Sequence, residues 1–319
     1  MDNEFNFDIE VNETNWLVDN LIPLGHLCVV ISQAGVGKSL LAECLAVNIT
    51  HSIDFIGRKT QSCNALIIDQ DTPTDVIQKR LVKFSKGLNT NRNCSLFLES
   101  MRGYQLKDHT LTTVINDYPS AKFVLIDSLH SVIEGLNSNG TSDMSKLFNL
   151  KEKCLTTDKV IWFNHHISEK CGADIKALMT KDPHKLSMGS SAIIQQADTY
   201  YIVGAVAQAG ITERIYLRTV SKRQSIPIPP IVLRVVQTSN SGEIIEFEGN
   251  YEPDLDEVEQ DIMTLFREQN VERTVKEVYD SMGHQHGEVS TREGLASLDK
   301  KGKLLMSRHK SNLFKYRLP

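Results

Sequence analysis

Eight residues, Ser32-Gln-Ala-Gly-Val-Gly-Lys-Ser39, constrain the fold of this chain more than any other segment. They follow an apolar run at 27–32 and open a stretch with helical spacing of apolar residues from Leu40 to Val47. A glycine-rich turn between a strand and a helix lets backbone N–H groups point at phosphate oxygens, and the helix N-terminus adds its positive end. The segment therefore predicts a phosphate-binding loop, or P-loop.

The residues of this loop have separate expected roles. Lys38 should reach the β- and γ-phosphates of ATP, and the Ser39 hydroxyl should ligate Mg²⁺. The motif normally begins with glycine, and Ser32 occupies that position here. The residues predicted to contact the nucleotide are Ser32, Gln33, Ala34, Gly35, Val36, Gly37, Lys38, Ser39 and Leu40.

A second element supports this prediction. The apolar run KFVLID at 122–127 ends in Asp127. An acid at the carboxyl end of a buried strand beside the P-loop can hold Mg²⁺ through water. The alternative is an aspartate that only terminates the strand in a turn.

Short apolar runs recur along the first 200 residues, separated by stretches with helical spacing. Strands that alternate with helices predict an α/β fold with a doubly wound, mostly parallel sheet. The runs at 214–220, 231–237 and 243–248 have no helix between them, which predicts an antiparallel extension at the sheet edge. The six runs predicted to form the parallel part are 27–32, 64–69, 95–100, 122–127, 160–165 and 199–204.

The pattern changes at the C-terminus, which divides the chain into an expected ATPase domain at 1–250 and a second domain at 251–319. Three short helical segments and an alternating ribbon in the second part resemble a winged helix. Ser290 with Glu293 three residues later predicts a capping box at the start of the third helix.

Composition excludes some classes of protein. The net charge of −5 gives no overall attraction to nucleic acid or anionic lipid. No CxxC pair occurs among the six cysteines, and Cys28 and Cys44 fall in apolar or helical segments, which predicts buried free thiols in a reducing compartment. No apolar run reaches about 18 residues. We therefore expect a cytoplasmic protein without a membrane segment.

The order of several segments in this chain resembles a known family. The segments WLVDNLIP, SQAGVGKSLLA, NALIIDQDTPTDVIQKRL, FVLIDS and IWFNHH follow one another as in the AAA-type ATPases grouped with plasmid RepA replication helicases. Those are RecA-fold proteins related to DnaB-type helicases, KaiC and RadA. The resemblance covers roughly residues 12–235 and implies a RecA-like ATPase that works as an oligomer, with a hexameric ring expected.

The resemblance also implies roles for residues at two strand ends. Asp71 matches the acid that activates the attacking water, although glutamate is commoner there. Asp69 is a neighbouring candidate, and Asp71 has an alternative role as the N-cap of a helix at Pro73. Asn164, His165 and His166 match the strand end that senses the γ-phosphate, with a purely structural role as the alternative.

Further contacts follow from the resemblance. The polar connection at 167–190, with His184 and four lysines, resembles a pore loop that grips single-stranded DNA, and the loop at 134–143 is a second candidate; a solvated loop is the alternative. In the segment TVSKR, Lys222 and Arg223 match residues that reach the γ-phosphate of a neighbouring subunit, unless they form a plain surface pair. The four pore-loop lysines are Lys170, Lys176, Lys181 and Lys185.

The C-terminal segment is locally basic. Between 292 and 317 there are eight lysines and arginines against Glu293 and Asp299. Arg292, Arg308 and Lys310 are the residues expected to contact duplex phosphates; a protein-interaction lid is the alternative. We therefore expect an ATP-dependent DNA helicase or translocase that acts in replication of a plasmid, phage or similar element. The alternatives are an ATP-switched DNA-binding regulator or loader, and a recombinase.

Overall fold

The computed structural model describes residues 14–100, 110–128, 141–166, 174–180, 196–208, 211–221, 228–308 and 314–319, and only the backbone of 110, 141–148, 207, 208, 211 and 221. These residues divide into two compact units. One unit comprises Met1–Pro229 with Leu233–Phe247, and the other comprises Pro230–Val232 with Glu248–Pro319. The two units are described separately below.

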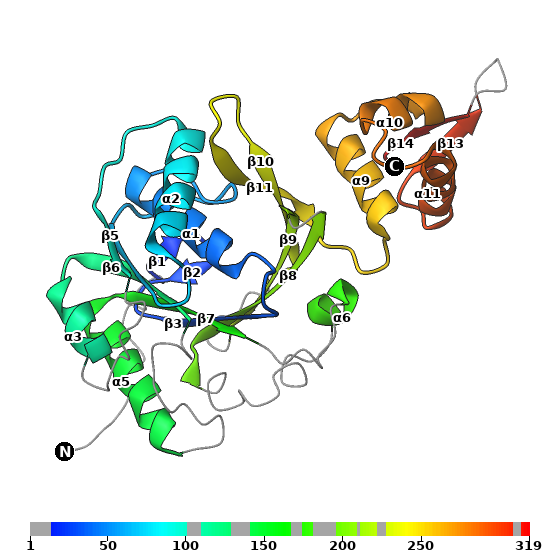
Figure 1. The fold of residues 1–319 in the computed structure, drawn as a ribbon. Coiled ribbons are helices and arrows are strands. Elements are labelled where there is room, and N and C mark those ends of the chain that lie inside the picture. The colour runs from blue at the N-terminus through cyan, green and yellow to red at the C-terminus, as the bar shows by residue number, and fades with distance from the viewer. Residues whose placement is uncertain are drawn as a thin grey trace, which may run out of the picture. The chain divides into compact units, whose positions relative to one another are not determined.

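A nine-stranded sheet forms the larger unit, in the order β11-β10-β9-β8-β3-β7-β6-β4-β5 (Figure 1). The strands from β8 to β5 in this order run parallel, whereas β8 and β9 are antiparallel. The predicted α/β fold is confirmed: the sheet is mostly parallel and has an antiparallel extension beyond β8. The bounds are β3 Leu27–Ser32, β4 Asn64–Asp69, β5 Leu96–Ser100, β6 Ala121–Asp127, β7 Val160–His166, β8 Thr199–Gln208, β9 Ile211–Ser221, β10 Ile231–Gln237 and β11 Glu243–Asn250.

Helices cover both faces of this sheet, as Figure 1 shows. On one face α1 (Lys38–His51) packs against α2 (Thr74–Leu88), and the hairpin of β1 (Trp16–Val18) and β2 (Ile22–Pro23) lies on the same side. On the other face lie α3 (Thr110–Asp117), α5 (Thr141–Thr157) and the short α6 (Ile175–Thr180). No described helix is long and apolar enough to cross a membrane.

The core explains why the central strands are apolar along their whole length. All six residues of β3 are buried, because both of its faces are covered by other elements. Trp162 of β7 stacks on Tyr201 of β8 with ring centroids 4.7 Å apart, and the Tyr201 hydroxyl donates to the carbonyl of Leu21 at 2.9 Å. Cys28 and Cys44 are buried free thiols, as predicted.

The smaller unit has its own core. Its three helices are α9 (Glu257–Glu268), α10 (Val275–Ser281) and α11 (Glu288–Lys300), and its sheet has the order β12-β14-β13. Residues from every helix and from the sheet meet in one cluster that includes Phe266, Val278, Leu298 and Tyr316. The predicted α+β arrangement is therefore present. The strands are β12 Arg273–Thr274, β13 Leu305–Arg308 and β14 Phe314–Arg317.

One local prediction for this unit is wrong. Helix α11 begins at Glu288 after Gly287, so Ser290 lies inside the helix and does not cap it. The backbone N–H of Thr291 donates to the carbonyl of Gly287 at 2.9 Å, so the first intrahelical bond already forms at Gly287, three residues before Ser290. Capping boxes occur instead at α9, with Asp256 and Glu259, and at α10, with Thr274 and Glu277.

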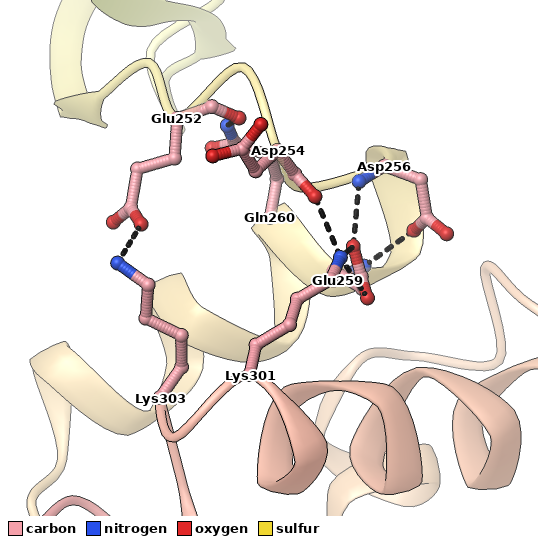
Figure 2. Close-up of polar contacts among 7 residues, drawn as sticks. All are labelled: Glu252, Asp254, Asp256, Glu259, Gln260, Lys301 and Lys303. Carbon is pink, nitrogen blue, oxygen red and sulfur yellow. Dashed lines mark hydrogen bonds and ion pairs between the residues drawn. The ribbon is translucent and has the colours of Figure 1, made fainter.

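Several basic residues of the smaller unit are held by acids within it. Lys301 Nζ lies 2.7 Å from both carboxylate oxygens of Glu259, and Lys303 Nζ lies 2.8 Å from a carboxylate oxygen of Glu252 (Figure 2). Lys301 also donates to the backbone carbonyl of Asp254 at 2.6 Å. These contacts join the end of α11 to α9 and to the segment before it, so part of the local positive charge is neutralised internally.

Candidate nucleotide-binding site

The backbone of residues 33–37 curls between β3 and α1. Gly35 and Gly37 have φ values of 76° and 84°, a region in which side chains other than glycine are strained. Gly37 is the N-cap of α1 and supplies no side-chain cap. The first N–H groups of α1 therefore lack acceptors within the helix, which makes this helix end suited to an anion such as phosphate.

Ser32 occupies the position where the motif normally has glycine, and its side chain makes a hydrogen bond within the loop. Its side chain is fully buried, and its hydroxyl donates to the carbonyl of Gln33 at 2.7 Å. The ammonium group of Lys38 donates to the same carbonyl at 3.0 Å. The Gln33 carbonyl thus joins the start of the loop to the start of α1.

The side chain of Lys38 lies near several of the residues predicted to form the nucleotide site. Its Nζ is 3.2 Å from Nδ1 of His166. Burial lowers the pKa of Lys38 to about 8, and the charges of Asp127 and Asp71 act in the opposite direction. The structure therefore brings Lys38, His166, Asp127 and Asp71 into one electrostatic environment.

The strand order explains this convergence. Strand β7 lies between β3 and β6, so β6 is not the direct neighbour of the P-loop strand. In the register, Ser32 pairs with His166 across β3 and β7, and Asp69 pairs with Asp127 across β4 and β6. Because parallel strands end at one edge of the sheet, all four residues lie along the edge next to the P-loop.

Asp127 has the properties expected of a magnesium-binding acid. The residue is 5% exposed, and Oδ2 has no hydrogen-bond partner among the described residues. A buried carboxylate oxygen without a partner is costly, and a hydrated cation would satisfy it. Asp127 and the half-buried Ser39 of α1 would hold Mg²⁺, which when bound neutralises charge on the phosphates.

The two acids at the carboxyl end of β4, Asp69 and Asp71, have different roles. Asp69 is buried, and its Oδ1 accepts backbone N–H groups from Asp71 at 2.8 Å and Thr72 at 2.7 Å. Burial raises the pKa of Asp69 to about 6. Asp69 therefore shapes the turn, and Asp71 is exposed beyond it. Pro73 is the N-cap of α2 and no side chain caps that helix, so the alternative role of Asp71 as its N-cap is wrong.

Asn164, near the carboxyl end of β7, is a further buried polar side chain close to the P-loop strand. Asn164 is fully buried, and neither atom of its amide has a partner among the described residues. Asn164 and His166 are two positions apart and so lie on the same face of the strand, whereas His165 lies on the other. An amide with both atoms unsatisfied next to the P-loop strand can donate to or accept from a ligand.

Glu43 of α1 is a residue that the sequence analysis missed. Its side chain is 1% exposed, and Oε1 lies 3.2 Å from Arg80 Nη1 of α2. Burial raises the pKa of this carboxyl to about 8 in spite of Arg80, and the charges of Asp127 and Asp69 act in the same direction as burial. An acid inside the apolar stretch LLAECLAV was the signal available in the sequence.

The other predicted site residues lie elsewhere. Lys176 is exposed on α6, in a part of the 167–190 connection that is helical and not a loop. Arg292 is exposed on α11 and lies 3.4 Å from Glu288, and Arg308 is exposed at the end of β13. The residues that fall outside the described ranges are Lys170, Lys181, His184, Lys185, Lys222, Arg223 and Lys310.

Comparison with known proteins decides the family. The sequence profile of a family described as an AAA domain matches residues 3–172, which is 170 of the 319 residues. The chain belongs to the AAA domain family. With the P-loop and Asp127 placed at one sheet edge, this makes the protein a P-loop ATPase with a RecA-like core.

Similarity to solved structures is weaker. The crystal structure of the RadB recombinase covers 72% of this chain and 92% of its own, with a TM-score of 0.49 and 13% sequence identity. A likeness of that degree concerns overall shape and carries nothing about activity. No curated protein sequence matches the AAA domain chain described here.

Proposed function

We propose that the protein is an ATP-dependent DNA helicase or translocase that acts in the replication of a plasmid, phage or other mobile element. One contact supports this most directly: Lys38 of the P-loop touches His166, the last residue of β7. The chain runs from His166 straight into the lysine-containing connection expected to grip single-stranded DNA. The mobile-element setting is supported by the family resemblance alone.

The chemistry would be divided among residues of this chain. Backbone N–H groups of the P-loop and the Lys38 ammonium bind the phosphates of ATP, and Ser39 and Asp127 hold Mg²⁺. Asp71 accepts a proton from the attacking water. His165, His166 and Asn164 report the presence of the γ-phosphate to the connection that follows them.

Hydrolysis would take place between subunits. Lys222 and Arg223 follow β9, and each would neutralise charge on the phosphates bound by the next subunit of a hexameric ring. Lys170, Lys176, Lys181 and Lys185 would contact the phosphates of a single strand in the ring centre.

A DNA-binding regulator or loader is the second candidate. The winged-helix-like unit, with exposed Arg292 and Arg308 and with Lys310 between β13 and β14, favours it. Internal pairing weakens it, because Lys301 and Lys303 are held by Glu259 and Glu252. Duplex binding by this unit that persists in a Lys38→Ala variant would favour the regulator.

The deciding experiment measures ATP hydrolysis with and without single-stranded DNA, together with unwinding of a forked duplex and particle mass. Lys38→Ala should abolish hydrolysis, and the double variant Lys176→Ala with Lys181→Ala should weaken single-strand binding and flatten its salt dependence. Hydrolysis that DNA does not stimulate, with no unwinding, would exclude the helicase. Strand exchange without unwinding would identify the recombinase alternative.

A further inference from the structure

The hairpin of β8 and β9 presents different residues on its two faces. In its antiparallel register Gly204 pairs with Tyr216, Ile202 with Arg218, and Ala205 with Ile215. Side chains alternate along a strand, so Gly204 and Arg218 lie on one face and Ile215 lies on the opposite face. The hairpin is thus in a position to contact two separate elements at once.

One face of the hairpin contacts the P-loop. A β-carbon added to Gly37 would lie 3.4 Å from Cδ1 of Ile215 and 3.5 Å from Cγ2 of Thr212. The Ile215 side chain is fully buried. Gly37 is also the N-cap of α1, so the side chain of Ile215 packs directly against the turn expected to hold the phosphates.

The other face holds α6. A β-carbon on Gly204 would come within 2.7 Å of Cδ1 of Ile175 and 3.2 Å of Cδ1 of Leu178, so α6 packs directly on the hairpin backbone. Arg218 donates from Nη1 to the carbonyl of Leu178 at 3.4 Å, near the end of the helix. Leu178 is buried in this contact, whereas Lys176 is exposed to solvent.

We propose that the β8–β9 hairpin couples the P-loop to α6, so that nucleotide binding regulates the contact of Lys176 with the phosphates of single-stranded DNA. Ile215 is the positioning residue on the P-loop side, and Gly204 and Arg218 are the positioning residues on the α6 side. This inference rests on the proposed function for its DNA partner, but the coupling of the P-loop to α6 does not.

The coupling works through packing. Phosphate that fills the P-loop fixes the backbone at Gly37, and Ile215 must adjust to it because cores repack in discrete arrangements. The hairpin transmits this adjustment to α6 because the helix packs so closely on Gly204 that a β-carbon there would lie only 2.7 Å from Cδ1 of Ile175. A ligand alters a distant site only when the element between the two sites responds to it.

Affinity for a fluorescent oligothymidine, measured by anisotropy on the full chain with and without a non-hydrolysable ATP analogue, tests the proposal. In the wild type the analogue should change the Kd for DNA by a factor of roughly 5–150. In Ile215→Ala this factor should fall below about 2, while DNA still binds without nucleotide. Leu217→Ala is the matched control, because Leu217 is equally buried on the same face of β9 and should keep the wild-type factor.

A second measurement separates this inference from the proposed function. Hydrogen exchange of the α6 amides should change on nucleotide binding in the wild type and in Leu217→Ala, and this change should be clearly smaller in Ile215→Ala and in Gly204→Ala. If α6 responds to nucleotide and the protein binds no DNA, the helicase proposal fails and the coupling stands. If Ile215→Ala binds the analogue and keeps the full response of α6, the coupling proposal is overturned.

Discussion

Replacing Glu43 with glutamine should flatten the pH dependence of the stability of the ATPase unit. The Glu43 side chain is 1% exposed, and burial raises the pKa of its carboxyl from 4.5 to about 8. In the unfolded chain this carboxyl ionises near its ordinary value. Between pH 4.5 and about 8 the folded protein therefore binds more protons than the unfolded chain, and the free energy of unfolding falls as the pH rises.

The magnitude follows from the width of that interval. Each pH unit within it lowers the free energy of unfolding by about 1.4 kcal/mol. Over the interval from 4.5 to about 8 the loss is of the order of 5 kcal/mol. Glutamine fills nearly the same volume and does not titrate, so the variant should lose none of this stability and should exceed the wild type at pH 8.

Urea unfolding followed by tryptophan fluorescence measures this difference. Both tryptophans, Trp16 and Trp162, lie in the ATPase unit, so the signal reports that unit alone. Glu246→Gln is the control, because its side chain is 46% exposed and should leave the wild-type pH dependence unchanged. If Glu43→Gln instead parallels the wild type from pH 5 to pH 8, the Glu43 carboxyl is ionised in the folded protein and the reasoning is refuted.

Three further predictions follow from other contacts. ATP affinity should fall above pH 8, because the pKa of buried Lys38 is about 8 and the neutral amine no longer attracts phosphate; Lys38→Arg should remove this dependence in calorimetric titrations at pH 7 and pH 9. Gly242→Ala should cost about 1–3 kcal/mol of stability in urea unfolding, since the new β-carbon would lie 2.2 Å from the backbone nitrogen of Gly87. Lys301→Ala should lower the hydrogen-exchange protection of α9 and α11 by about 1.5–3 kcal/mol, because Glu259 is 2% exposed and loses its ammonium partner, whereas Lys300→Ala should have little effect.

Much of the fold was predictable because the central strands are buried on both faces. Continuous apolar runs such as 64–69 then coincide with strands, and β4 spans those same residues. Helix α6 was missed because it has only six residues and lies in a polar connection, where a single buried turn gives little periodic signal. Strand order was not predictable from the pattern of runs, so the position of β7 between β3 and β6 had to come from the structure.

The placement of the candidate site residues in the fold was predictable where a residue type is tied to a motif. Lys38 and Asp127 were placed by the P-loop and by an acid at a strand end, and the structure brings both to one sheet edge. Glu43 was missed although an acid within an apolar helical stretch is a visible signal, because its partner Arg80 is 37 residues away on another helix and the pairing cannot be read from the sequence. Ser290 was misjudged because a capping-box pattern does not say which of several small residues begins the helix.

The topology itself suggests why a nucleotide and a DNA strand can act on each other in this fold. The two sheet neighbours of β3, the strand that leads into the P-loop, are β7 and β8. These are also the two strands joined by the connection that contains α6 and Lys176. That connection leaves β7 beside Lys38, and its helix packs on the hairpin that begins with β8 and contacts Gly37. The start of the connection and its helix α6 are therefore linked to the P-loop by separate contacts, the first at His166 and the second through Ile215 of the β8–β9 hairpin. Removing one of these contacts by substitution should weaken the response of α6 to nucleotide, and removing both should abolish it. The double variant His166→Ala with Ile215→Ala is therefore more informative than either single variant.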